Sequence, residues 1–171
     1  MKRLLGLVLF LTGLLAACAP FSRQIMDQID PTLTLQEIQK DPQKYLGKTA
    51  LWGGVIIDTI NRQNETLIKV TQTELDFEKS PKNLDHSLGR FLVRHPGFLD
   101  PDIYKKGREI TVAGEVVGTE ILPVGEVKYV YPVILAKAIQ LWEKPQVYQP
   151  YYPPWYWGPY PYWWGPYHYW R

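Results

Sequence analysis

The sequence predicts a mainly β domain built as a small, strongly bent barrel, with an open α+β sheet as the alternative. Three observations support the barrel. Five extended segments rich in β-branched and aromatic residues follow one another between residues 49 and 142. A short helical pattern separates the third segment from the fourth. Gly53 and Gly54 interrupt the first segment, which indicates a bulge or the tight bend that barrel closure needs.

A brief helix is expected to lead into the first strand. Thr34, followed three residues later by Glu37, has the pattern of a capping box, and Leu35 with Ile38 gives the helix one apolar side. A second short turn, which Gly47 ends, then delivers the chain to the sheet.

The remaining elements follow from the change to an extended period. Asp100 before Pro101 predicts a helix start, and Gly107 predicts its end about two turns later. Strands are expected at residues 49–60, 65–72, 90–94, 110–117 and 127–142. A helix between the third and fourth strands matches the order of an OB-type five-stranded barrel, in which closure removes exposed edges.

The first seventeen residues have the pattern of a signal peptide. Lys2 and Arg3 precede the apolar segment 4–15, which is shorter than the roughly 20 residues that a membrane-spanning helix needs. The order Leu-Ala-Ala before Cys18, the sole cysteine, resembles the lipobox of bacterial lipoproteins. The resemblance implies cleavage before Cys18, whose sulfur receives diacylglycerol and whose amine receives an acyl chain such as palmitate.

Several acyl chains on Cys18 make physical sense, because one chain holds a protein only marginally on a membrane. An ordinary secretory signal followed by a free or buried cysteine is the alternative. Ala19, rather than Asp, follows the cysteine, and the sorting rule that comes with the resemblance then favours the outer membrane. The expected partner of Cys18 is therefore outer-membrane lipid.

The expected organisation has four parts. Residues 1–17 are the signal peptide, 18–31 the lipidated N-terminus and a short polar tether, 32–144 the barrel domain, and 145–171 a low-complexity tail. Removing Lys2 and Arg3 from 19 basic residues leaves 17, equal to the 17 acidic residues. Such neutrality argues against nucleic acid as a partner.

No catalytic constellation emerges from the sequence. The three histidines, His86, His95 and His168, lack metal-ligand spacing, and no serine sits in a GxSxG elbow. We therefore expect no catalytic residue, metal or cofactor, and a non-enzymatic role. Two alternatives stay open: an oligonucleotide- or ligand-binding module that uses Trp52, Phe91 and nearby arginines as a stacking groove, and a cryptic envelope hydrolase.

Several short motifs resemble the starvation-inducible outer-membrane lipoprotein family, Slp. They are GFLDP at 97–101, TVAG at 111–114 and YVYPV at 129–133, with a Tyr and a Gly-Arg pair between the first two. The resemblance covers roughly residues 1–142. It implies a lipid-anchored protein of the outer membrane, facing the periplasm, associated with starvation or stationary phase and without an established enzymatic activity.

The motif residues have structural explanations, namely glycines at turns, Asp100 as a cap, and Phe98, Leu99 and Tyr104 as packing residues, with Pro132 as a strand kink. The functional alternative is a binding surface. Its predicted members are Arg90, Arg94, Tyr104 and Arg108.

The tail combines prolines with large aromatic residues. WGPY occurs twice, from Trp157 and from Trp164, and the prolines favour an extended chain with turns. Tyr and Trp are typical of membrane interfaces and of adaptable contacts with proteins or sugars. We expect contacts with the membrane surface, or with an envelope protein or glycan, through Trp157, Tyr160, Trp164 and Tyr167.

Overall fold

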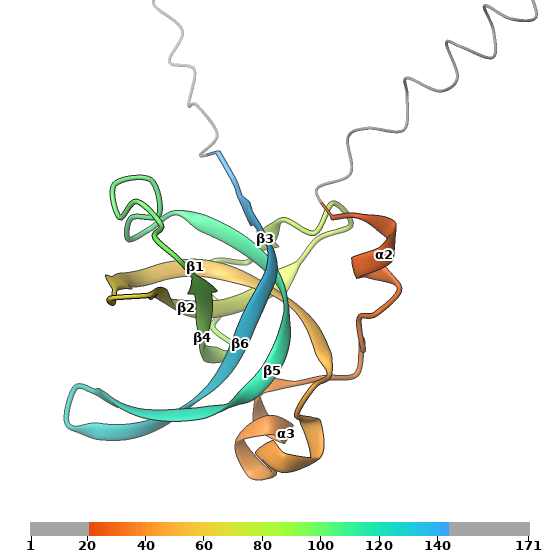
Figure 1. Cartoon of the computed structure of the whole chain (residues 1–171), viewed down its shortest axis with the longest axis horizontal. Coiled ribbons are helices and arrows are strands. Elements are labelled where there is room, and N and C mark those ends of the chain that lie inside the picture. Colours follow the sequence, from red (N-terminus) through yellow and green to blue (C-terminus); the bar gives the residue numbers. More distant parts are fainter. Residues whose placement is uncertain (1–20, 144–171) are drawn as a thin grey trace, which may run out of the picture.

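The computed structural model describes residues 21–143 (Figure 1). Three short helices precede a sheet that is rolled up on itself. In chain order the elements are α2 (Arg23–Met26), α3 (Leu35–Lys40), η2 (Pro42–Tyr45), β1 (Thr49–Asn61), β2 (Glu65–Leu75), β3 (Pro81–Lys82), β4 (Gly89–Pro96), β5 (Glu109–Val124) and β6 (Val127–Leu141).

Five of the strands close into a barrel. The hydrogen-bonded order is β1, β5, β6, β4, β2, and β2 pairs again with β1. The β4–β6 pair is parallel and the other barrel pairs are antiparallel, while β3 adds two residues to β2. The predicted mainly β, OB-like five-stranded barrel is confirmed. The open sheet is excluded because β1, the first strand in the sheet order, also pairs with β2 and so closes the sheet.

The two adjacent glycines allow that double pairing. Between Gly53 and Val55, β1 bonds to β2 on one side and to β5 on the other. A Cβ at Gly54 would overlap the carbonyl oxygen of Thr71, and one at Gly53 would lie 2.8 Å from Oγ1 of Thr111. The glycines therefore permit a close approach of three strands, as the predicted bend requires, whereas the register irregularity lies further along β1.

The barrel encloses the main core. Trp52 and Phe91 pack edge to face inside it, with ring centroids 5.4 Å apart. Leu35 and Ile38 of α3 are buried against one end of this core. Their helix has the predicted capping box, in which Oγ1 of Thr34 and the side chain of Glu37 each accept from the other residue's backbone N–H.

A second apolar cluster lies on the outer side of β4. Leu92 is fully buried there with Tyr131 and Val133 of β6, and Leu122 and Tyr129 pack against them. The β5–β6 hairpin is longer than the barrel (Figure 1), and its paired residues form this cover. The fourth strand is consequently longer than the predicted 110–117.

The predicted helix at residues 100–107 is wrong. Asp100 does act as a cap, because its Oδ1 accepts from the N–H of Asp102, and Tyr104 N–H donates to the Asp100 carbonyl. A helix that starts at Asp100 needs the N–H of Gly107 for the carbonyl of Ile103, but this N–H donates to the carbonyl of Ile56 in β1. The side chains of Thr59 and Asn61 also donate to the carbonyls of Tyr104 and Leu99. Those contacts hold the segment as turns across the barrel end opposite α3.

The segment that was expected to be a tether is folded against the barrel from Phe21 onward. Phe21 is 3% exposed, α2 follows it, and Ile29 pairs with Thr49 at the start of β1. The few apolar residues in this otherwise polar stretch supply the contacts, which a reading of its average polarity overlooks. Among residues 21–143 no helix is long and apolar enough to cross a membrane.

Candidate functional site

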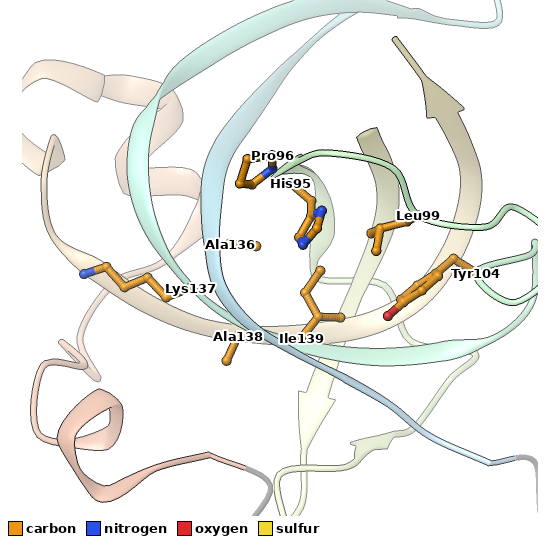
Figure 2. A pocket seen from close by; sticks show the side chains of 8 residues that line it. All are labelled: His95, Pro96, Leu99, Tyr104, Ala136, Lys137, Ala138 and Ile139. Carbon is orange, nitrogen blue, oxygen red and sulfur yellow. The ribbon is translucent and has the colours of Figure 1, made fainter. Parts of the chain in front are cut away.

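A pocket opens at the barrel end that the turns of residues 97–107 cover. Its cavity measures about 380 Å³ and is lined by His95, Pro96, Leu99, Tyr104, Ala136, Lys137, Ala138 and Ile139. Figure 2 shows His95, Leu99, Tyr104 and Ile139 turned toward one another, while Lys137 points away. The Nζ of Lys137 instead donates to Gln28 and to Thr49.

Five of the eight lining residues of the pocket are apolar, and the other three include one imidazole and one phenol. The Nδ1 atom of His95 is buried and has no hydrogen-bond partner among the described residues. No carboxylate, serine or cysteine is among the residues that line the pocket. A small, largely apolar molecule is the kind of ligand that such walls suit.

The structure separates the members of the predicted binding surface. Arg90 and Arg94 flank Leu92 on the outer side of β4, whereas Tyr104 lines the pocket at the barrel end. Arg108 lies just before β5, and its guanidinium donates to the carbonyl of Trp142 over 3.0 Å. No hydrogen bond among the described residues joins these four side chains, and their role in binding stays a prediction.

The charge of Arg94 is matched by carboxylates. Its Nε lies 3.2 Å from Oε2 of Glu65, close enough for an ion pair although poorly aligned for a hydrogen bond. Glu65 also pairs with Arg62, which reaches Glu120. Exposed pairs of this kind contribute only about 0–1 kcal/mol each, but they place carboxylates beside both Arg62 and Arg94.

The stacking groove that was expected from Trp52 and Phe91 is wrong. Trp52 is 4% exposed and Phe91 is fully buried, and the indole N–H of Trp52 donates to the carbonyl of Leu33. Strand alternation turns both rings into the barrel, where no base can reach them. Phe98 also departs from its expected packing role, because it is 72% exposed, while Leu99 and Tyr104 do pack on the core.

One strongly shifted carboxylate fixes the lead-in segment. Hydrogen bonds from the Thr32 side chain and from Lys48, with the Thr32 backbone N–H, lower the pKa of Asp30 to about 2. The same hydrogen bond and the charge of Asp30 raise the pKa of Lys48. Asp30 N–H also donates to the carbonyl of Thr49. The arrangement joins the lead-in to the start of β1 and has no catalytic geometry.

The sequence analysis did not predict the pocket, the burial of Phe21 or the strong exposure of Phe77. His95 and Ile139 are too far apart in sequence to indicate a shared cavity. In the sequence, Phe21 and Phe77 are both isolated aromatic residues in polar segments. Nothing there indicates that Phe21 is buried and that Phe77 is 87% exposed. The predicted lipidation site Cys18 and the tail residues Trp157, Tyr160, Trp164 and Tyr167 lie outside the described residues.

The described residues contain no group of three or more His, Cys, Asp or Glu side chains that could hold a metal ion. The fold and its surface define a class of protein: a small closed β-barrel of OB-like order, with Trp52 and Phe91 packed inside the barrel and a pocket at one end. The outer membrane lipoprotein Slp family model matches residues 15–170, and the chain belongs to that family. This match extends past residue 142, over most of the tail, further than the motifs alone indicated.

Two relatives come from Escherichia coli K12. The chain is 30% identical over 155 residues to the outer membrane protein Slp, covering 90% of this chain and 82% of the relative. It is 31% identical over 131 residues to the uncharacterized lipoprotein YeaY, covering 75% of this chain and 67% of the relative. A solved structure, Schizosaccharomyces pombe Pot1pC bound to single-stranded DNA, covers 60% of this chain and 83% of its own at a TM-score of 0.32 and 11% identity, too distant to bear on function.

Proposed function

We propose that this protein is a lipid-anchored component of the outer membrane, with its barrel on the periplasmic side and a structural or binding role instead of a catalytic one. The observation that carries the proposal is the family match, which begins at residue 15 and so includes Cys18. The relative named as an outer membrane protein supports the location. Starvation or stationary phase is the condition in which the role matters.

Processing at Cys18 is tested directly in cells. Globomycin, which blocks the lipoprotein signal peptidase, should make the uncleaved precursor accumulate, and mass spectrometry of the native protein should find an acylated first residue. A Cys18→Ala variant is the matched control and should leave the membrane fraction. A mature chain with an unmodified thiol, or one that begins elsewhere, contradicts the proposal. Protease accessibility in intact and permeabilised cells tests which side the barrel occupies.

The stress association and the non-enzymatic role have their own tests. Abundance should rise on entry into stationary phase, and a deletion strain should show its defect in the envelope under starvation. Purified protein should hydrolyse none of a panel of ester, peptide and glycoside substrates. Turnover that disappears in a His95→Ala variant would instead favour the hydrolase.

The tail is proposed as a further contact with the envelope, through its aromatic residues. Deleting residues 148–171 should leave the barrel folded, as circular dichroism would show, and reduce the binding of the acylated protein to envelope fractions. Unchanged binding would remove the adhesive role. Crosslinking in intact cells would distinguish a protein or glycan partner from lipid.

The apolar pocket supports a second function, the binding of a small ligand at the barrel end. Enlarging Ala136 to Phe should fill the cavity beside His95 and Tyr104. A fluorescent apolar probe that binds the natural protein should then lose its signal, while a Phe98→Ala variant, changed outside the cavity lining, should retain it. Equal probe binding by both variants would rule the pocket out.

A further inference from the structure

The fold begins very close to the predicted anchor. Only Ala19 and Pro20 separate Cys18 from Phe21, which is buried, and three backbone steps span at most about 11 Å. If Cys18 is acylated, as proposed above and on which this inference rests, the barrel has no room to stand away from the lipid. The face around Phe21 must lie at the membrane surface.

The turn between β2 and β3 occupies the same face. Met26 and Ile29, from α2 and the residues after it, line a cavity together with Leu75, Asp76 and Lys79. Figure 1 shows this turn beside the start of α2. Its tip is Phe77, whose side chain is 87% exposed.

Several hydrogen bonds hold the turn in place. Asp76 and Ser80 exchange backbone and side-chain bonds of 2.9 Å, and Lys79 N–H donates to the Asp76 carbonyl. Oγ1 of Thr111 donates to the Lys79 carbonyl over 2.6 Å, where Lys79 has a left-handed φ of 69°. These bonds fix the backbone of the turn, and they hold Phe77 at an exposed position on it.

The other end of the described chain reaches the same place. Oγ1 of Thr111 also accepts from the indole N–H of Trp142, over 3.0 Å. Trp142 and the β2–β3 turn thus both form hydrogen bonds with the side chain of Thr111. In Figure 1 the end of β6 and the start of α2 are at the same edge of the barrel. The described chain therefore ends at the same edge of the barrel at which it begins.

We propose that the anchor face, formed by Met26, Phe77 and Trp142 on the side of the barrel where Phe21 begins the fold, lies flat against the phospholipid surface, with the ring of Phe77 inserted at headgroup depth. An apolar ring at the end of a rigid turn suits this position, while the adjacent charge of Glu78 stays in the hydrated headgroup layer. Acyl chains supply the attachment, and Phe77 sets the orientation of the barrel. The tail then begins within reach of the same interface.

The test uses acylated full-length protein in vesicles of phosphatidylethanolamine and phosphatidylglycerol. Acylation blocks Cys18, the only natural cysteine, so Phe77→Cys provides a single free thiol for an environment-sensitive fluorophore. Val127→Cys is the matched control, because Val127 is an exposed apolar residue, 67% exposed, at the tip of the β5–β6 hairpin, far from α2 (Figure 1). Glu78→Cys replaces Phe77→Cys if that variant does not fold.

The label at position 77 should shift to shorter wavelength on vesicles and be quenched by lipid-borne spin labels, and the label at 127 should do neither. Two labels that both stay in water, on protein shown by mass spectrometry to be acylated and by flotation to be bound, would overturn the orientation and leave the anchor intact. Quenching at 127 alone would reverse the face. Protection of position 77 in cells but not on vesicles would assign the face to a protein. Absence of acylation would refute the anchor itself.

Discussion

Leu92 offers the sharpest test of how the long β5–β6 hairpin is held. Its side chain is fully buried on the outer side of β4, under Tyr131 and Val133. Replacing it with alanine removes the apolar contacts and leaves a cavity between two paired strands that cannot easily move together. Truncations of this kind cost about 2–5 kcal/mol, a large part of the roughly 5–15 kcal/mol that a domain has.

The assay is urea unfolding of the mature chain carrying Cys18→Ala, followed by circular dichroism. With a mid-range slope of about 2 kcal/mol per molar urea, the midpoint should fall by roughly 1–2.5 M. Leu135→Ala is the matched control, because Leu135 is partly exposed on the neighbouring strand and should cost below about 1 kcal/mol. Amide exchange should quicken in residues 120–131 of the hairpin.

A double-mutant cycle with Tyr131→Ala shows whether the side chains of Leu92 and Tyr131 contact each other or whether each substitution destabilises the fold independently. Residues that touch are coupled by about 0.5–3 kcal/mol, whereas distant ones add independently. A cost for Leu92→Ala no greater than that for Leu135→Ala, or strict additivity with Tyr131→Ala, would refute the packing of the hairpin over β4.

Three further predictions follow from the geometry. Gly54→Ala should abolish cooperative unfolding, because its Cβ overlaps the Thr71 carbonyl; a normal circular dichroism melt would show that β1 and β2 are not so close. Asp30→Asn should destabilise the protein at neutral pH, because the contacts that lower the pKa of Asp30 stabilise the folded protein only while this carboxylate is ionised. The difference in stability from the natural chain should therefore vanish as the pH falls from about 4 through about 2, and a difference independent of pH would contradict this. Phe98→Ser should leave the melting temperature unchanged while Leu99→Ala lowers it, and equal effects would contradict their different burial.

The sequence predicts the barrel well because local patterns and global closure agree. Alternation marks the strands, and Gly53 with Gly54 marks the place where three strands crowd together. The capping box at Thr34 can also be predicted from the sequence, because its two residues are only three positions apart. The failed helix at 100–107 shows the limit: its N-cap, Asp100, is present, but the N–H of Gly107 bonds to the carbonyl of Ile56 in a distant strand instead of to the preceding helical turn.

The candidate site is less legible because it depends on which way each side chain faces. The sequence around Trp52 and Phe91 is compatible both with an exposed stacking surface and with a buried core. Only the register of the closed barrel determines that both rings point inward. Phe77 reads as one aromatic residue in a polar loop. Its position beside α2 follows from contacts between segments about 50 residues apart.

The closed barrel also bears on the kind of work this fold performs here. Nucleic-acid recognition on an OB barrel needs exposed aromatic platforms and unpaired cations, yet the ring pair inside this barrel is buried and Arg94 faces carboxylates. The two ends of the barrel are covered by α3 and by Leu99 with Tyr104, and the pocket beside His95 lies at the second of these ends. The outer surface of the barrel remains available for contacts with a partner, and the proposed anchor at Cys18 would decide which part of that surface meets the membrane.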